Sequence, residues 1–553
     1  MLANIATVTI ARFESDSVVA DNALGIFSDS STTLVSIETL DSSQDSSVSI
    51  RADEAELWAL TNSLTPLKRN LILIAVSMGA MLHSMATTSV SVVLPQLQGS
   101  LSATPDQISW VITVAVIGSV IATPLSGWLV DRLGWRRVTL ISSIGFSIAT
   151  LLCASAESLE TMLFARFFQG GFGAPMIPVA QAILLATFPD NERSWSQSAH
   201  GIATVLGQAM APVIGAYFAA TYDWRYAFLF LIPIAIASIA MTALWVPAGG
   251  RRQGTRLDWT AFIALSISIT AFQLALDRGE RLYWFESSLI VTYTIIAVVG
   301  FTVFLIRSLG HQNPFIDLSL FKNREFAIGT IIIILFGAIS FLPNFLYPVI
   351  LGNLLGYPET TIGAVLFIRG LGLLTGFFVV AWSASRYPRT TLLIGFASTG
   401  AAGVQGIFFS LNVQLHTVAV AAFAQGFGVA LIWVPTIIAA FSTLSPVLLA
   451  QSSAVFHLLR QVAMSASLAL MVGVTLRTGA ITYSELSSQL NPSSPDMVEG
   501  GWNVESIEGI AALSAEIERQ SQMVGYANAF VLYTLGCLLG AVLGLAVRAR
   551  PRG

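Results

Sequence analysis

Charged side chains inside long apolar stretches are the residues of this sequence most able to do chemistry. Charged residues make up only 10% of the 553 residues, yet Arg166, Arg369 and Arg460 each stand within such a stretch. If the stretches cross a membrane, a charge at that depth costs on the order of 3 kcal/mol and marks a functional site by default. The chemistry would be electrostatic. Snorkelling of Arg166 to the outer surface is the alternative, and structural roles are equally well supported for Arg369 and Arg460.

His83 lies near the middle of its apolar stretch, where an imidazole that titrates near neutral pH could carry a proton. A hydrogen-bonded histidine with a purely structural role is the alternative. No Asp or Glu occurs deep in any of the apolar stretches. If charge selects the ligand, three arginines without acids favour neutral or anionic amphiphiles over cations.

Several polar side chains within the stretches could line a cavity between helices. Glutamines are the clearest examples, because an amide both donates and accepts hydrogen bonds. Each of them could equally form a hydrogen bond between two helices. The candidates for the cavity lining are Gln181, Gln208, Gln425 and Arg369.

A tight turn between two of the apolar stretches carries one acid and three bases. An acid that pairs with another part of the protein in one state, and releases it in the other, would bias a two-state gate. Arginines that only anchor the turn to the inner face of a membrane are the alternative. The candidate gating residues are Gly127, Asp131, Arg132, Gly134, Arg136 and Arg137.

Small residues recur every four positions in one later stretch, at Gly207, Ala211 and Gly215. This spacing places them on one face of a helix and permits a close approach of a neighbouring backbone. Pro212 removes a backbone donor and can kink the same helix. The spacing by itself predicts a packing seam.

Several classes of function lack their usual residues. The sequence has no GxxxxGK[ST] phosphate loop, so we do not expect this chain to bind and hydrolyse ATP to drive its work. It has no cluster with metal-ligand spacing, no cofactor motif and no convergent nucleophile and base, so we expect no metal, no cofactor and no enzyme activity. The basic residues are scattered among loops, which does not indicate a nucleic-acid surface. Cys153 and Cys537 lie in apolar runs and are expected to pack rather than pair.

The elements that position these residues are fourteen stretches of about twenty apolar residues each. A helix of that length crosses about 30 Å of hydrocarbon, and it satisfies its own backbone hydrogen bonds there. The sequence therefore predicts an all-α membrane protein with fourteen transmembrane helices. We place them near 70–93, 108–130, 138–157, 160–187, 198–220, 226–247, 260–277, 288–306, 328–350, 360–382, 390–411, 415–441, 454–476 and 526–548.

Basic residues in the connecting segments predict the orientation, because positive loops stay in the cytoplasm. With the N-terminus inside, seventeen Lys and Arg residues fall on the inner side and five on the outer side. Both termini are then cytoplasmic. The acidic segment 477–525 faces outward.

An internal repeat indicates how the helices are grouped. The pattern Gln169-Gly170-Gly171-Phe172-Gly173 returns as Gln425-Gly426-Phe427-Gly428, and two further patterns return at nearly the same offset. Repeated halves with a binding site at their interface are a common plan for transporters. We therefore predict a disordered cytoplasmic tail (1–65), a six-helix bundle (66–250), two inserted helices (251–310) and a second six-helix bundle (311–553) with an outward loop (477–525).

Four of these segments together resemble signatures of the major facilitator superfamily. The stretch from Gly127 to Leu140 resembles its GxLaDrxGrrxxl loop, and the stretch from Arg166 to Ala174 resembles RxxQGxGaA. The stretch from Gly207 to Ala216 is similar to the GxxxGPxxGG antiporter motif, and Asp277-Arg278-Gly279-Glu280 with Trp284 resembles a segment of fourteen-helix drug:proton antiporters. The resemblance covers residues 66–550 and is closest to the EmrB/QacA-type exporters.

The resemblance implies roles for individual residues. It implies proton coupling for Arg166, and a helix pivot formed by Gly207, Ala211, Pro212 and Gly215, although Ala211 and Ala216 replace glycines of the motif. It also implies an aspartate in the first span, where this sequence has Ala86. Because His83 lies one turn earlier on roughly the same face, it is our substitute candidate for coupling.

We therefore expect a proton-coupled exporter of drug-like or amphipathic compounds that works by alternating access. It would lie in the plasma membrane, in a bacterium the inner membrane, and the family suggests a periplasmic membrane-fusion adaptor as partner. The segment 477–525 is a candidate dock for that adaptor or a disordered spacer. A lipid or metabolite exporter on the same scaffold and a membrane sensor without transport are the alternatives.

Overall fold

The structure is a computed structural model that describes residues 64–251, 257–310, 314–489 and 506–547. All of these residues belong to one compact unit, which spans 53–553. The predicted disordered tail 1–65 lies outside the described residues, except for its last two. Thirteen helices of the described chain are long and apolar enough to cross a membrane, so the chain is a multi-pass membrane protein.

The first bundle contains six spans. Two of them are interrupted helices, α6–α7 and α9–α10; between α6 and α7 stands Pro175, which has no N–H to continue the hydrogen-bond ladder. Threonine and serine side chains begin several of these helices; Thr104 and Gln107, for example, form a reciprocal capping box at α4. The helices are α3 (Pro66–Ser100), α4 (Pro105–Leu133), α5 (Trp135–Ala154), α6 (Leu159–Gly173), α7 (Met176–Thr187), α8 (Arg193–Thr221), α9 (Tyr226–Leu229) and α10 (Leu231–Trp245).

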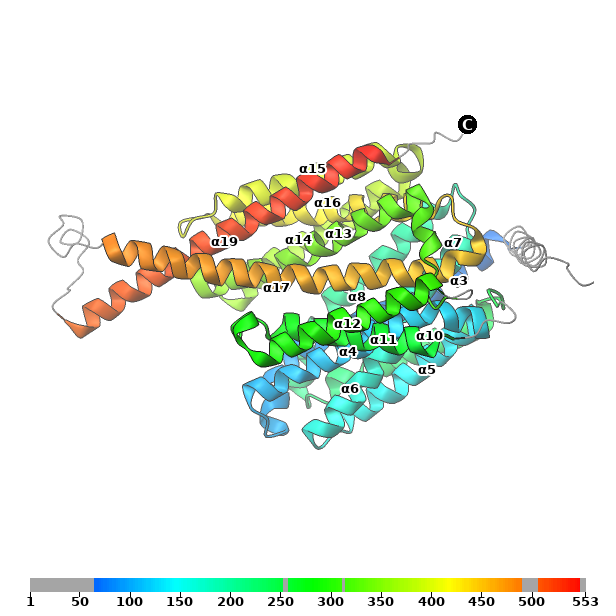
Figure 1. The fold of residues 1–553 in the computed structure, drawn as a ribbon, viewed down its shortest axis with the longest axis horizontal. Helices are drawn as coiled ribbons and strands as arrows, with labels where there is room; N and C mark the ends of the chain where they lie inside the picture. The colour runs from blue at the N-terminus through cyan, green and yellow to red at the C-terminus, as the bar shows by residue number, and fades with distance from the viewer. Residues whose placement is uncertain (1–63, 252–256, 311–313, 490–505, 548–553) are drawn as a thin grey trace, which may run out of the picture. The chain divides into compact units, whose positions relative to one another are not determined.

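Two inserted helices, drawn in green in Figure 1, lie between the first and the second bundle in the sequence. They are α11 (Trp259–Arg278) and α12 (Ser288–Gly310), and Ser268 of α11 donates a hydrogen bond of 2.7 Å to the carbonyl of Ala297 in α12. The second bundle contains α13 (Arg324–Val349), α14 (Glu359–Arg386), α15 (Pro388–Ile407), α16 (Leu415–Phe441), α17 (Leu449–Gln489) and α19 (Ile507–Ala546). All fourteen predicted spans are thus helices. Of these, α15 falls short of the apolar composition of the other thirteen, because it is rich in Gly, Ala and Thr.

The predicted repeat is visible in the backbone packing of the two bundles. A Cβ on Gly118 of α4 would lie 2.2 Å from the carbonyl oxygen of Phe167, and one on Gly372 of α14 would lie 2.2 Å from that of Phe423. In the same way, Gly170 packs on Ala115 and Gly426 on Arg369. Equivalent glycines therefore press equivalent helix pairs together in both halves, which confirms the two pseudo-repeat bundles.

The last two long helices differ from the prediction. The segment expected to be an outward loop, 477–525, continues α17 to Gln489 and begins α19 at Ile507, and only 490–505 lies outside the described residues. With 41 and 40 residues, these helices are about 60 Å long at 1.5 Å per residue, twice the thickness of the hydrocarbon core. The prediction of a loop was wrong here because loss of hydropathy ends a span but not a helix, and neither 477–489 nor 506–525 contains proline.

These extensions pack against each other. The Tyr483 hydroxyl of α17 lies 2.9 Å from the Ser514 hydroxyl of α19, and a Cβ on Gly479 would lie 3.6 Å from the carbonyl oxygen of Ser521. Figure 1 shows both helices running past the others at the end of the unit opposite the start of α3. The described parts of the acidic segment, 477–489 and 506–525, thus form two packed helices, which we call the hairpin of α17 and α19.

Candidate functional site

The charged turn between α4 and α5 is bound to the end of its own bundle. Gly134 has a φ of 81°, which favours glycine, and a Cβ there would lie 2.9 Å from the carbonyl oxygen of Gly249. The Trp135 indole donates a 2.8 Å hydrogen bond to the Pro247 carbonyl, and the Arg136 guanidinium donates to the Ala243 carbonyl at the end of α10. These contacts hold the turn against the end of α10.

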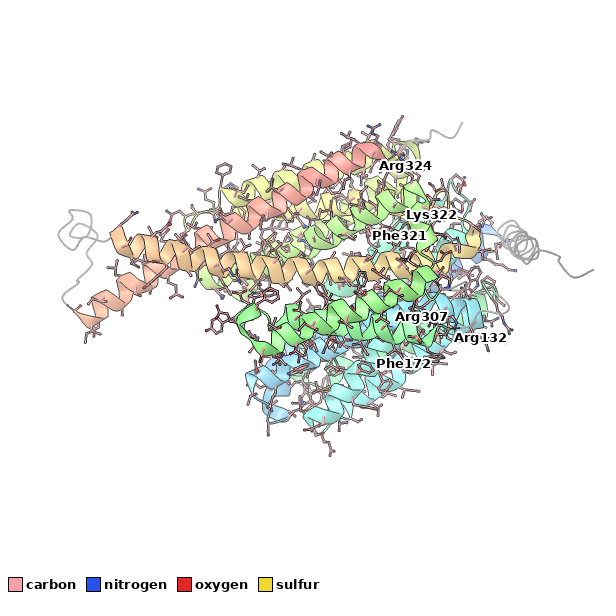
Figure 2. The ribbon with its side chains drawn as sticks, viewed as in Figure 1. Arg132, Phe172, Arg307, Phe321, Lys322 and Arg324 are labelled. Carbon is pink, nitrogen blue, oxygen red and sulfur yellow. The ribbon has the colours of Figure 1, made fainter. Side chains whose placement is uncertain are left out.

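The two bundles touch where α4 and α14 end and where α8 and α17 begin, which we call the Arg132 end. A Cβ on Gly127 of α4 would lie 2.8 Å from the Cα of Gln451 in α17, and one on Gly201 of α8 would lie 2.4 Å from the Phe377 ring of α14. These two contacts are related by the internal repeat. Arg132, Arg307, Lys322 and Arg324 lie toward this end (Figure 2), in agreement with the predicted gathering of basic residues on one side.

Hydrogen bonds join the bundles just beyond these close contacts. His457 Nε2 of α17 lies 2.6 Å from Gln181 Oε1 of α7, and the Thr123 hydroxyl donates a 3.3 Å hydrogen bond to Gln461 Oε1. Gln181, predicted to line a cavity, is therefore part of the contact between the bundles. The sequence analysis did not select His457, because nothing near it in the sequence indicates this partner.

The halves of α8 and α14 farther from the Arg132 end are more open. A Cβ on Gly363 or Gly370 would meet nothing within 4 Å. Large side chains of α8, including Met210, Val213 and Tyr217, are exposed, as is Gln208. The close contact of α8 with α14, Gly201 against the Phe377 ring, thus lies in the halves nearer the Arg132 end.

Arg166 is buried in the first bundle, with 3% of its surface exposed. Its Nε donates a 3.1 Å hydrogen bond to the Val111 carbonyl, and its Nη1 donates to Gln169 Oε1. The Gln169 amide in turn donates a 2.8 Å hydrogen bond to the Thr150 hydroxyl. Arg166 therefore does not snorkel to a surface, and its hydrogen-bond partners are neutral.

Arg369 of α14 is also held by a glutamine, which here comes from a different helix, α16. Its Nε donates a 2.6 Å hydrogen bond to Gln425 Oε1, its Nη1 a 2.8 Å hydrogen bond to Asn344 Oδ1, and its Nη2 a 3.0 Å hydrogen bond to the Ser340 carbonyl. Gln169 and Gln425 are repeat equivalents, so each half uses the same glutamine to hold an arginine. The structure thus brings Arg369 and Gln425 together as a side-chain network between helices.

Arg460 of α17 differs from the other two arginines. Its buried Nε has no hydrogen-bond partner, and no ion pair with it occurs within the described ranges. The guanidinium carbon lies 5.5 Å from the centre of the Trp433 ring. Trp433 also contacts Phe336, at 5.1 Å between ring centres, and His457, at 5.8 Å. Arg460 therefore lies against a group of aromatic rings, and its Nε–H has no hydrogen-bond acceptor among the described residues.

His83 is buried in α3 and lies against α6, where a Cβ on Gly173 would be 2.2 Å from its Nδ1. Neither ring nitrogen is hydrogen-bonded to any residue that the structure describes. This argues against the structural alternative of a histidine satisfied by protein partners.

The small-residue motif of α8 packs inside the first bundle. A Cβ on Gly207 would lie 2.7 Å from Met81 Cγ of α3, Ala211 is fully buried, and a Cβ on Gly215 would lie 3.5 Å from Ser89 Cβ. The helix runs unbroken from Arg193 to Thr221 through Pro212. The motif forms a seam between α8 and α3, and its role as a pivot stays a prediction.

The motif after α11 ties the inserted helices to the first bundle. The Thr113 hydroxyl of α4 donates a 2.9 Å hydrogen bond to Asp277, and Arg281 lies 2.6 Å from Asp106. The Trp284 indole donates to Glu280, which closes the turn. No group of three metal-ligating side chains occurs among the residues described.

Comparison with known proteins decides the family. Residues 76–468 match the sequence model of the Major Facilitator Superfamily. The chain belongs to this superfamily. The resemblance inferred from the four motifs is thereby confirmed.

Relatives of this superfamily member are named for multidrug export or for resistance. It is 29% identical over 493 residues to the multidrug export protein EmrB of Escherichia coli K12, covering 86% of this chain and 94% of EmrB. It is 27% identical over 434 residues to the fatty acid resistance protein FarB of Neisseria gonorrhoeae, covering 77% and 85%. These relatives confirm the EmrB-type resemblance.

Solved structures of the superfamily share the fold. The human organic anion transporter MFSD10 has a TM-score of 0.56 at 15% identity, covering 86% of this chain and all of that one. The proton:xylose symporter XylE has a TM-score of 0.54 at 14% identity, covering 85% and 95%. At such identities the likeness shows the fold alone.

Proposed function

We propose that this chain is a proton-coupled secondary exporter that moves drug-like or amphipathic compounds out of the cell by alternating access. The names of its relatives support export, and membership of the superfamily supports transport rather than enzyme chemistry. The observation that carries the proposal is the placement of the contacts between the bundles at the Arg132 end. Rocking transporters need such a state, closed on one side of a central site.

The charged turn acts as the gate. Gly127 lies against Gln451 in the first turn of α17. Asp131, one turn farther along the same face of α4, is thereby directed toward the N-terminus of α17, whose partial positive charge attracts a carboxylate. Because Trp135 and Arg136 tie the turn to α10, rocking of the first bundle withdraws Asp131 from α17 and opens the gate.

Proton coupling runs through His83 and Arg166. His83 lies against Gly173 of α6, the helix that carries Arg166. A proton on His83 would repel Arg166 and strain its hydrogen bonds to Gln169 and Val111. Proton entry from outside would therefore favour a different packing of α3 on α6, and so reset the transporter.

The predicted location is the bacterial inner membrane with both termini in the cytoplasm, which places the Arg132 end inside. The hairpin of α17 and α19 then projects into the periplasm. Its exposed side chains include Ile481, Ile510 and the acidic Glu485 and Glu508. We propose this hairpin as the dock for a membrane-fusion adaptor.

A fatty-acid or lipid exporter on the same scaffold is the second candidate. The name of FarB favours it, because fatty acids are amphipathic compounds whose export the same site could serve.

The test is export from proteoliposomes under an imposed pH gradient, with cationic, neutral and anionic amphiphiles as cargo and a trapped pH dye as proton readout. We expect cargo movement to be coupled to proton movement. His83→Ala should release the coupling, so that cargo equilibrates without proton flow, whereas His416→Ala, in the first turn of α16, should behave as wild type. Full coupling in both His83→Ala and Arg166→Ala would refute the assigned roles, and no gradient-driven movement of any cargo would refute the proposed function.

A further inference from the structure

We infer that Arg460 binds the anionic head group of the cargo, so that the transporter prefers amphipathic organic anions with an aromatic or apolar body. The inference rests on the proposed function, and it adds a substrate class and a binding residue to it. Among the three arginines within the bundles, Arg460 is set apart by its missing partners.

Hydrogen bonding separates Arg460 from the two structural arginines. Arg369 donates to three oxygens and Arg166 to two, so both are held by protein groups. The Nε of Arg460 is buried and donates to none of the described residues. A guanidinium keeps its charge inside a protein, and leaving it without an acceptor is costly.

The position of Arg460 matches a cargo site between the bundles. His457, three residues earlier in α17, bonds to Gln181 of the first bundle and closes the Arg132 end. Arg460 lies about 4.5 Å farther along the helix on nearly the same face, at 1.5 Å per residue. It is therefore just beyond the closed contact, on the side that faces away from the Arg132 end.

The surroundings of Arg460 suit a carboxylate attached to a flat apolar body. The Trp433 ring lies against the guanidinium, and Phe336 and His457 extend the aromatic surface. A carboxylate accepts two parallel hydrogen bonds from a guanidinium, and aromatic faces pack against rings of the cargo. No acidic side chain forms an ion pair with Arg460 in the part of the chain that the structure describes, so nothing competes with an anion.

The binding test uses three probes with one body and different heads: pyrenebutyrate, pyrenebutanol and pyrenebutyl-trimethylammonium. Binding to protein in nanodiscs is measured by energy transfer from tryptophan to pyrene, with empty nanodiscs subtracted. We expect wild type to bind the carboxylate about tenfold or more tightly than the alcohol, since hydrogen bonds to charged groups are the stronger ones. Arg460→Gln should remove this preference while it still binds the alcohol, and Arg460→Lys should keep most of it.

Arg477→Gln is the matched control, because Arg477 stands in the same helix, is exposed and is expected to leave binding unchanged. Equal affinity of wild type for the carboxylate and the alcohol would overturn the inference, as would an unchanged preference in Arg460→Gln. If Arg460→Gln does not fold, the test rests on the affinity ratio between the carboxylate and the alcohol, measured in wild type and in Arg460→Lys.

Gradient-driven export of the alcohol without any preference for the anion would refute this inference and leave the proposed function standing. A binding preference for the anion without gradient-driven transport would support this inference and refute the proposed function.

Discussion

Single residues show how buried arginines can have opposite roles. Arg166 and Arg369 look alike in the sequence, and both turn out to be held by a glutamine of the repeated motif. Arg460 has the same kind of apolar neighbours and no such partner. The sequence could identify all three as candidates, but it could not separate them, because partners such as Asn344 and Ser340 come from other helices.

Removing the glutamine that holds Arg369 tests its structural role. In Gln425→Leu, the Arg369 Nε loses its acceptor inside the bundle, which should cost about 1–3 kcal/mol of stability. Thermal unfolding of the purified protein measures this as a lower apparent melting temperature. Gln414→Leu at the exposed start of α16 should change little. Equal melting temperatures for the two variants would show that the Arg369 network is dispensable.

At the level of elements, the repeat was readable from the sequence because its signals are local. Glycines at nearly equal offsets predicted two repeated halves, and the structure places Gly170 and Gly426 against backbone in both of them. The lengths of α17 and α19 were not readable in the same way. Their outer turns are polar enough to end a hydropathy signal, and what supports them is contact between two segments that are distant in sequence.

Enlarging a packing glycine tests the equivalence of the halves. A Cβ on Gly170 would lie 2.0 Å from the Ala115 carbonyl oxygen, and one on Gly426 would lie 2.1 Å from that of Arg369. Gly170→Leu and Gly426→Leu should each force two helices apart, at a cost of about 3 kcal/mol or more. Gly363→Leu in α14, where nothing lies within 4 Å, is the control. Yields of monodisperse protein after purification should fall for the first two variants, and normal yields would contradict the packing.

The hairpin of α17 and α19 makes a second prediction at this level. A Cβ on Gly479 would lie 3.9 Å from the Cα of Gln522, which is within reach of a disulfide. In a background with Cys153 and Cys537 replaced by serine, Gly479→Cys with Gln522→Cys should form a disulfide under mild oxidation, as mass spectrometry can show. Gln520→Cys in place of Gln522→Cys should not, because residue 520 is on another face of α19. Equal disulfide formation in both pairs would mean that the two helices are not held in this register.

For the whole molecule, the sequence predicted two bundles but not their relative state. Orientation and grouping follow from charge and repetition, which are properties of the chain. The contacts that close the Arg132 end join residues more than 170 positions apart, such as Gln181 with His457 and Gly127 with Gln451. Side chains as ordinary as Gln451 carry no signal of such a contact in one sequence.

Locking this end tests alternating access directly. A Cβ on Gly127 would lie 3.4 Å from Gln451 Cβ, so Gly127→Cys with Gln451→Cys should form a disulfide while the Arg132 end is closed. If the bundles must part at the Arg132 end to load cargo, oxidation should abolish export and a reductant should restore it. The single variants, treated alike, show whether oxidation acts by other routes. Export that continues at the wild-type rate through a fully crosslinked protein would exclude rocking of the bundles, because cargo could then cross without opening this end.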